Sequence, residues 1–398
     1  MLKPLPFPFP ADHPLCPSSL LGAARRGRAP VHVRLDHGDP AWLVTRYEDA
    51  RHVLSSPAFG RDRQRAGIPA ARVAGLRSVD LPSHSLFSTD PPDHTRLRRF
   101  VYRMFTPRRV EGLRDGAHKI ANRLVDSMIG EGPPADLVAG FGLALPVEVI
   151  CDLLGVPLAD RPLFSVWADG LLRMDLPAER VITCMEELNA YMAGLAAERA
   201  DEPADDLISA LVRERVEGDR LTGDELISML RSLLVAGHET TASQISNFVF
   251  LLLRGGDYAR LTTDPGLIPT AVEELLRYVP LITQGSMTRF VLEEVELGGV
   301  RLRPGEQVIV ELSAANRDAN AFTDPDALDL RREDNPHVAF GHGLHRCVGA
   351  ALARMELQVA LTTLAARLPG LRLAVPPDDV SWHADRLVRH PKALPVTW

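Results

Sequence analysis

The sequence predicts a mainly α protein with a small β region, and three observations lead to this prediction. Apolar residues recur at helical spacing through most of the chain, and the longest such stretch spans residues 222–256. Alternating apolar residues occur only in short runs near 31–45, 296–301 and 308–310. The 398 residues are 45% hydrophobic, which is enough to bury a large core.

Composition indicates one continuous domain at 31–398 after a Pro-rich N-terminal leader at 1–30, because no repeat, charge block or Ser/Gly run marks a linker. Prolines at every second or third position of residues 4–10 exclude a signal or membrane helix there. The four cysteines have unrelated spacings, which indicate no disulfide framework. We therefore expect a cytoplasmic protein without a membrane partner. A formal charge of -7 argues against nucleic-acid binding.

The N-terminal half contains a few short elements followed by helices. Residues 31–45 predict a β-hairpin, and residues 47–55 predict a short helix. Residues 60–84 show no period and are rich in Arg, Gly and Ser, which is typical of a functional or mobile segment. A helix begins after Asp90-Pro91-Pro92, and residues 111–220 have a helical pattern with breaks at Gly and Pro.

The longest predicted helix begins with a capping box, Thr222 paired with Glu225, and ends at Gly255-Gly256. Its centre reads Ala236-Gly237-His238-Glu239-Thr240-Thr241, and glycine with two β-branched threonines is a poor choice for a helix interior. The threonine hydroxyls are expected to bond back to the helix backbone. A local penalty in a central helix indicates a function there.

Shorter elements follow this helix. A helix from Asp264 stops at Pro280 and places Glu274 and Arg277 at i and i+3 on one face. Residues 296–301 predict a tight hairpin with a Gly-Gly turn, and residues 308–310 predict a further strand.

One cysteine lies in a glycine-hinged loop, residues 340–349, just before a helix predicted from Ala350 to about Arg367. A thiolate at a helix N-terminus is stabilised by unpaired backbone N–H groups and by the helix dipole. The loop therefore suits a deprotonated Cys347 that binds a metal. Two alternatives are a buried structural cysteine and a zinc site with His342 and His345, although no second Cys/His cluster is present.

The pattern Phe-x-x-Gly-x-x-x-Cys-x-Gly, at Phe340, Gly343, Cys347 and Gly349, resembles the haem-ligating loop of the cytochrome P-450 superfamily. The whole sequence is similar to soluble, actinobacterial members that tailor natural products. The resemblance implies the cytochrome P-450 fold, a helical prism around haem b, with Cys347 as the axial thiolate. It also implies a monooxygenase that inserts one oxygen atom from O2 into an apolar small molecule by hydroxylation or epoxidation.

The resemblance assigns further residues, each at the matching place in the family's order of motifs. Glu239 and Thr240 match its acid–alcohol pair for proton delivery, with Gly237 leaving room for oxygen. Glu274 and Arg277 match a buried pair that braces the haem loop. The family often adds an arginine to that pair where this chain has Ala327, so we expect Arg331 or His337 to replace it. The residues expected to bind the haem propionates are His94, Arg98, Arg289 and His345, and those expected to line the substrate pocket are Val235, Ala236, Leu281, Ile282, Thr283 and Leu387.

Six arginines and no acid lie between Thr95 and Val110, a basic patch on a net acidic chain. We expect its outward members, Arg103 and Arg109 among them, to dock an acidic electron donor of the ferredoxin type, itself served by a ferredoxin reductase. A solvated surface is the competing interpretation of this patch.

Two other functions fit a haem-thiolate protein: a peroxygenase or isomerase that uses bound peroxide, and a non-catalytic haem sensor. The first class usually lacks the acid–alcohol pair that this chain has at Glu239 and Thr240. The second class needs neither a proton relay nor a docking patch. The sequence therefore favours the monooxygenase.

Overall fold

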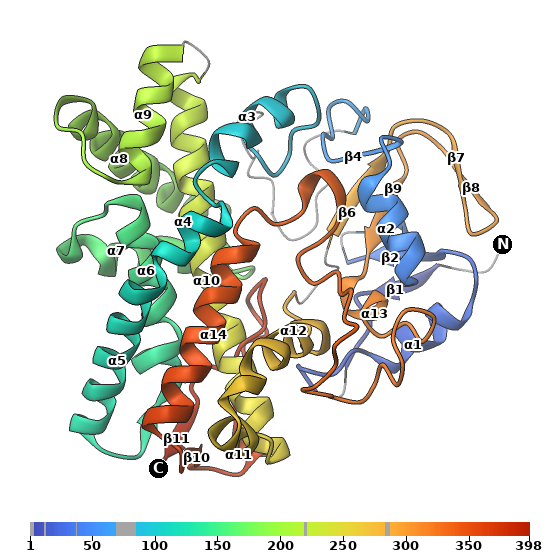
Figure 1. Ribbon diagram of the computed structural model, residues 1–398. Helices are drawn as coiled ribbons and strands as arrows, with labels where there is room; N and C mark the ends of the chain where they lie inside the picture. The colour runs from blue at the N-terminus through green and yellow to red at the C-terminus, as the bar shows by residue number, and fades with distance from the viewer. Residues whose placement is uncertain (1–3, 12, 37, 69–84, 219–220, 283–286) are drawn as a thin grey trace. The chain divides into compact units, whose positions relative to one another are not determined.

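The computed structural model of the protein describes residues 4–11, 13–36, 38–68, 85–218, 221–282 and 287–398 (Figure 1). The chain divides into two compact units. The first comprises residues 1–80, 87–90 and 270–347, and the second comprises 81–86, 91–269 and 348–398.

The described chain is mainly helical, as predicted. Its α-helices are α1 (Ser19–Arg26), α2 (Tyr47–Ser55), α3 (Asp93–Tyr102), α4 (Pro107–Gly112), α5 (Arg114–Glu131), α6 (Ala144–Leu154), α7 (Arg161–Leu172), α8 (Ala178–Asp201), α9 (Leu207–Gly218), α10 (Gly223–Gly255), α11 (Tyr258–Thr263), α12 (Ile268–Tyr278), α13 (Leu312–Ala315) and α14 (Ala350–Arg367). Short 3-10 or π segments are η1 (Val138–Gly142), η2 (Leu158–Asp160), η3 (Pro265–Leu267), η4 (Gly343–His345) and η5 (Pro377–Asp379).

The first unit contains the larger sheet, with strand order β1-β2-β3-β9-β6-β4. Strands β2 (Val31–Leu35) and β3 (Pro40–Val44) are antiparallel, which confirms the predicted hairpin. Strand β9 (Gln307–Val310) continues the sheet as expected, parallel to β3 and antiparallel to β6. The remaining strands of this sheet are β1 (Leu5–Phe7), β4 (Phe59–Gly60) and β6 (Met287–Val291).

Two smaller β elements complete the described strands. The predicted Gly-Gly hairpin is confirmed, because β7 (Val295–Leu297) pairs antiparallel with β8 (Val300–Leu302). In the second unit, β11 (Pro395–Thr397) pairs with both β10 (Arg372–Leu373) and β5 (Ala135–Asp136). Strand β1 comes from the Pro-rich leader and pairs parallel to β2, so part of the leader belongs to the larger sheet.

Helix α10 is the longest element of the second unit, and its 33 residues at about 1.5 Å each span roughly 50 Å. The capping box predicted at its start is present: Thr222 Oγ1 accepts from Glu225 N–H at 3.2 Å, and Glu225 Oε2 accepts from Thr222 N–H at 2.9 Å. All residues from Thr241 to Phe250 are buried. The helix is therefore buried all round over these turns, as expected at the centre of a core.

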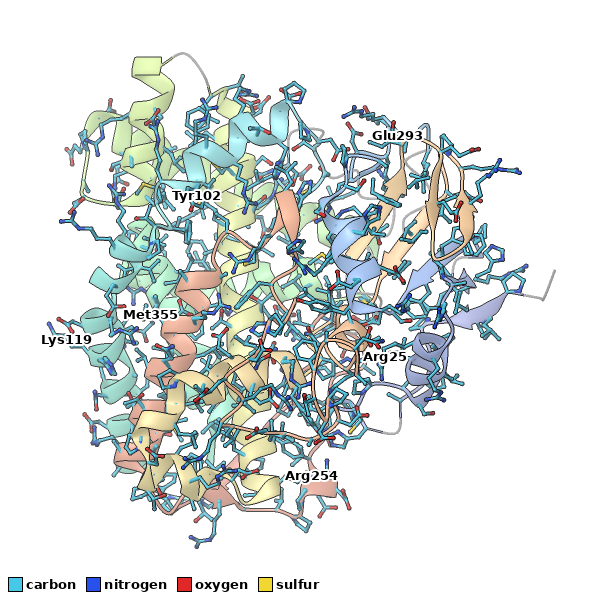
Figure 2. All side chains as sticks on the ribbon, turned by 45° about the vertical axis from the view of Figure 1, so that its right-hand side comes forward. Arg25, Tyr102, Lys119, Arg254, Glu293 and Met355 are labelled. Atoms are coloured by element: carbon cyan, nitrogen blue, oxygen red, sulfur yellow. The ribbon has the colours of Figure 1, made fainter. Side chains whose placement is uncertain are left out.

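Helices α14 and α5 lie side by side in the same unit, and α14 also packs on α10 (Figure 1). Met355 on α14 is 2% exposed, whereas Lys119 projects outward from α5 (Figure 2). Helix α14 has the predicted bounds, Ala350–Arg367. None of the described helices combines the length and the apolar composition that a membrane crossing requires.

Candidate active site

The Cys347 loop closes on itself through one backbone hydrogen bond, from Cys347 N–H to Phe340 O at 2.9 Å. Gly341 and Gly343 have φ angles of 71° and 69°, a left-handed conformation that strains other residues. Helix α14 begins at Ala350, three residues after Cys347, as the sequence predicted. The Cys347 side chain is exposed. The loop therefore offers its sulfur to a partner outside the protein atoms.

The two glycines of the motif serve different purposes. A Cβ atom on Gly343 would lie 2.4 Å from the carbonyl oxygen of Leu54 and 2.8 Å from Ser55 Cα, so α2 leaves room for glycine alone. A Cβ atom on Gly349 would meet nothing within 4 Å among the described atoms. Gly343 thus seats the loop against α2, and Gly349 borders open space.

An anion is held next to this loop in the first unit. The Asp90 carboxylate accepts hydrogen bonds from Arg61 N–H at 2.9 Å and from Asp62 N–H at 3.0 Å. His345 Nε2 lies 3.8 Å from Asp90 Oδ1. Burial alone would raise the pKa of Asp90, but the nearby His345 and the hydrogen bonds from the two N–H groups outweigh it and hold the pKa at about 2. Asp90 is therefore charged at neutral pH.

Arginine side chains give the same cluster an excess of positive charge. Arg289 is 2% exposed, and burial, reinforced by the charge of Arg61, lowers its pKa to about 9. Burial also lowers the pKa of Arg61 to about 10. Two arginines thus face one carboxylate, and an anionic group would stabilise them. The propionates of haem are such anions, so the cluster fits the cofactor that the sequence implied. The propionate-binding roles of His345 and Arg289 remain predictions.

The zinc alternative has no set of ligands. Across the described residues, no three His, Cys, Asp or Glu side chains gather as they do around a metal ion. His345 faces Asp90 instead, and Cys347 is exposed.

The other two residues expected to bind propionates, His94 and Arg98, lie one turn apart on α3 in the second unit. His94 is fully buried, and Arg98 is partly buried. Between them, Arg96 pairs with Glu225 at the start of α10, through a contact from Nη2 to Oε1 and one of 3.3 Å from Nη1 to Oε2. The ion pair fixes α3 to α10 and leaves the other face of α3 to His94 and Arg98.

The centre of α10 carries the acid–alcohol pair. Thr240 Oγ1 donates to Ala236 O at 2.8 Å, which confirms the expected bond back to the helix. Val235, Ala236, Gly237 and Thr240 are partly exposed, although the turns on either side are buried. From Leu233 to Phe250, the partly exposed residues of α10 are therefore these four. Thr240 Oγ1 donates its proton to Ala236 O, so the same oxygen can accept a hydrogen bond from another group.

Gly237 has a packing role that the sequence did not reveal. A Cβ atom there would lie 3.2 Å from Ile150 Cδ1 on α6. The expectation that this glycine makes room for oxygen was therefore incomplete, because its missing side chain lets α6 approach α10.

Glu239 is 2% exposed and is held by a residue that the sequence analysis missed. Arg386 Nη1 donates to Glu239 Oε1 at 3.0 Å, and Arg386 Nη2 pairs with Asp169 Oδ1 on α7. Burial raises the pKa of Glu239, and the charge of Arg386 opposes this rise. His238 is buried and burial lowers its pKa to about 4, consistent with the structural role expected for it. No spacing rule links Arg386 to Glu239, because 147 residues separate them.

The Glu274–Arg277 pair is present and fully buried, with contacts of 2.7 and 2.8 Å between the guanidinium and the carboxylate. The expected third arm was wrong: neither Arg331 nor His337 supplies it. Arg332 Nε donates to Glu274 Oε2 at 3.0 Å, whereas His337 pairs with Glu273. The segment around Ala327 has no helical or strand period, so spacing did not show which arginine turns inward.

The residues expected to line a substrate pocket fall in both units. Val235, Ala236 and Leu387 of the second unit and Leu281 and Ile282 of the first are partly exposed. Thr283 lies outside the described residues, as does most of the 60–84 segment. The lining role of all six residues remains a prediction.

Comparisons with known proteins agree with this chemistry. Residues 266–393 match the family model for cytochrome P-450. The chain is 45% identical to mycinamicin IV hydroxylase/epoxidase from Micromonospora griseorubida over 398 residues, covering 100% of this chain and 99% of that protein. It is 48% identical to nocardicin C N-oxygenase from Nocardia uniformis over 370 residues, which are 92% of each chain. The solved structure of HinD with NMFT and NO has a TM-score of 0.93 at 46% identity, and that of the mixed-function cytochrome P-450 MycG has 0.91 at 45%, each covering 100% of both chains.

The chain therefore belongs to the cytochrome P-450 family, as its resemblance to that family predicted. It has the cytochrome P-450 fold, and its cofactor is haem b with an axial cysteine thiolate. It is a monooxygenase of secondary metabolism that uses dioxygen and electrons from a redox partner.

The Glu274 network gives a first prediction. Arg332→Met removes one charged hydrogen bond from a fully buried carboxylate, and we expect a loss of about 1–3 kcal/mol in the free energy of unfolding. Arg331→Met, a neighbouring exposed arginine, is the matched control, with an expected change within about 0.5 kcal/mol. Chemical denaturation of the haem-loaded proteins measures both. Equal losses in the two variants would contradict the assignment of Arg332.

Proposed function

We propose that Cys347 is the axial ligand of haem iron and that His94, Arg98, Arg289 and His345 hold the propionates. The observation that carries this proposal is the pair of arginines beside the Asp90 carboxylate, Arg289 buried and Arg61 partly exposed, next to a loop that presents an exposed thiol. Phe340, Gly343 and Gly349 shape that loop for a flat group. The bound haem supplies dioxygen binding and activation.

The proposed task of α10 is to deliver protons. Reduction of dioxygen with insertion of one atom consumes two electrons and two protons and releases water. Thr240 Oγ1, which donates to Ala236 O, accepts a hydrogen bond from a water or from the reacting oxygen. Glu239 passes on a proton and regains one from water. A relay acid must be charged and uncharged in turn, and the opposing effects of burial and Arg386 on Glu239 are consistent with this.

We infer that the substrate is an apolar small molecule with a few polar groups, which is hydroxylated or epoxidised, as in antibiotic biosynthesis. Support comes from the apolar, partly exposed residues Val235, Ala236, Leu281, Ile282 and Leu387. Further support comes from relatives named as a mycinamicin IV hydroxylase/epoxidase and a nocardicin C N-oxygenase.

We further propose an acidic ferredoxin, served by its reductase, as electron donor and the cytoplasm as the place of action. Arg99, Arg103, Arg108 and Arg109 are exposed around Tyr102, an aromatic side chain that is 59% exposed. Exposed aromatic and arginine side chains are typical of contact surfaces. Arg103 forms an exposed ion pair with Glu214 at 2.9 Å, which is too weak to neutralise the patch.

The ligand assignment is tested first. The haem-loaded protein, reduced and exposed to carbon monoxide, is expected to show the strongly red-shifted Soret band of thiolate ligation. Cys347→Ser is expected to lose this band and turnover together. Cys16→Ser, which changes an exposed cysteine elsewhere, is the control and retains both. A Cys347→Ser variant with full turnover would end the proposal.

The second test concerns the alcohol of the acid–alcohol pair. Thr240→Ala is expected to keep haem and substrate binding while diverting most electrons to hydrogen peroxide, because the hydrogen-bond acceptor at Oγ1 is gone. Thr241→Ala, whose hydroxyl lies on a buried turn, is the control. The measurement is product and peroxide formed per electron supplied. Unchanged coupling in Thr240→Ala would favour a protein that needs no relay.

The third test concerns the donor surface. Reversing Arg103 and Arg109 to glutamate is expected to slow electron transfer from a ferredoxin at least tenfold at low salt and less at high salt, because salt screens exposed charges. Arg254→Glu serves as the control, because Arg254 is an exposed arginine in the last turn of α10, whereas α3 contacts the first turn of that helix (Figure 2). Equal rates in all three proteins would leave the patch as a solvated surface.

A further inference from the structure

One guanidinium serves two carboxylates in the second unit. Arg386 Nη1 donates to Glu239 Oε1 at 3.0 Å, and Arg386 Nη2 pairs with Asp169 Oδ1. The exposed fractions of the side chains are 3% for Glu239, 16% for Arg386 and 37% for Asp169. The three groups therefore form a line from the interior of the helical unit toward its surface.

The neighbouring imidazoles do not replace Arg386 as the counter-ion of Glu239. His390 Nε2 lies 3.8 Å from Glu239 Oε1, but burial lowers the pKa of His390 to about 4. His238, the residue before Glu239 on α10, also has its pKa lowered by burial to about 4. Both rings are neutral at pH 7. Arg386 is thus the cation that balances Glu239 among the described residues.

The backbone around Arg386 is fixed to the end of α7. Leu387 N–H donates to Leu172 O at 3.1 Å, and Met174 N–H donates to Asp385 O at 2.8 Å. Arg173 and Arg386 form an isolated antiparallel bridge. The Arg386 side chain therefore leaves a segment that is paired with α7 and reaches across to Glu239 on α10.

Protonation of Glu239 changes the balance of charge in this cluster. A neutral Glu239 no longer stabilises the Arg386 guanidinium. Leaving a partly buried charge without a counter-ion costs roughly several kcal/mol. Asp169 reduces this cost, because Arg386 keeps its contact with the Asp169 side chain while Glu239 carries a proton. Arginine does not itself give up a proton at neutral pH. Its function here is therefore to hold a carboxylate and release it.

We propose that Arg386 is a positioning residue for Glu239, and that Asp169 is the second partner that holds the guanidinium whenever Glu239 is protonated. The proposal rests on the proposed role of Glu239 as relay acid. In each cycle Glu239 gives one carboxyl proton to the reacting oxygen and takes one from water. The redox partner supplies the electrons, and Arg386 and Asp169 exchange no proton.

Other titratable groups also face this cluster. In the described part of the chain, beyond the two imidazoles, they include His383 and Asp385 from the C-terminal segment and Arg173 and Asp175 from the turn after α7. Asp175 is exposed and pairs with Arg173 at 2.6 Å, so it is a suitable control.

The test is an infrared titration of the haem-loaded protein without substrate. The carbonyl stretch of protonated Glu239 is identified as the band that Glu239→Gln removes. Asp169→Asn removes a competing carboxylate from Arg386, which stabilises the Glu239 carboxylate, and is expected to lower the titration midpoint by on the order of one pH unit. Arg386→Gln removes the cation and is expected to raise the midpoint by on the order of one pH unit. Arg386→Lys keeps the charge and is expected to restore part of that rise, and Asp175→Asn is expected to leave the midpoint unchanged.

Opposite shifts of the Glu239 midpoint in Asp169→Asn and Arg386→Gln support the proposal. If Asp169 and Arg386 were only structural, the midpoint would stay unchanged or would shift in the same direction in both variants. Unmoved midpoints, or shifts of the same sign, overturn it. The carbon monoxide spectrum of each variant verifies that the haem site is intact. The fraction of electrons recovered in product is then followed against pH. The midpoints can shift in opposite directions while the pH dependence of this fraction stays the same in all variants. That result would support the pairing of Arg386 with Glu239 and Asp169 and would contradict the relay role of Glu239.

Discussion

A fully buried arginine holds the irregular segment that leads to Cys347, and the candidate haem site depends on it. Arg277 donates to Glu274 through two hydrogen bonds and to the backbone carbonyls of Asn316, Pro325 and Ala327 at 2.7–3.0 Å. It thereby uses the five N–H donors of a guanidinium. From Asn316 to the loop at 343 the chain has neither helix nor strand, so side chains must satisfy its polar backbone groups.

Two buried glutamates in this protein have opposite environments, and the difference agrees with the roles proposed for them. Glu274 accepts from Arg277, Arg332, Asn335 and the backbone N–H of Asp329, so its carboxylate is saturated with donors. Glu239 depends on one guanidinium that has a second carboxylate to turn to. A carboxylate saturated with donors braces the fold, whereas Glu239, whose guanidinium has a second carboxylate partner, can change its protonation state.

Helix α10 contains both fully buried turns and a central turn with partly exposed residues. The turns from Thr241 to Phe250 are buried on every side and carry no charged residue, yet Ala236 and Thr240 remain partly exposed one turn apart. Glycine and threonine are unfavourable at this place for the helix alone. Gly237 allows the close approach of α6, and the Thr240 hydroxyl donates a hydrogen bond to Ala236 O. These contacts account for two residues that are unfavourable in a helix.

The sequence by itself determined what local patterns encode: the capping box of α10, the bounds of α14 and both hairpins. These follow from periods, caps and turn residues that act over a few positions, and the family resemblance extended them to haem and monooxygenation. Only the tertiary structure decided which distant side chains meet. Arg332 reaches Glu274 from a segment without a period, and Arg386 reaches Glu239 across 147 residues, because such contacts arise from the path of the chain and not from spacing along it.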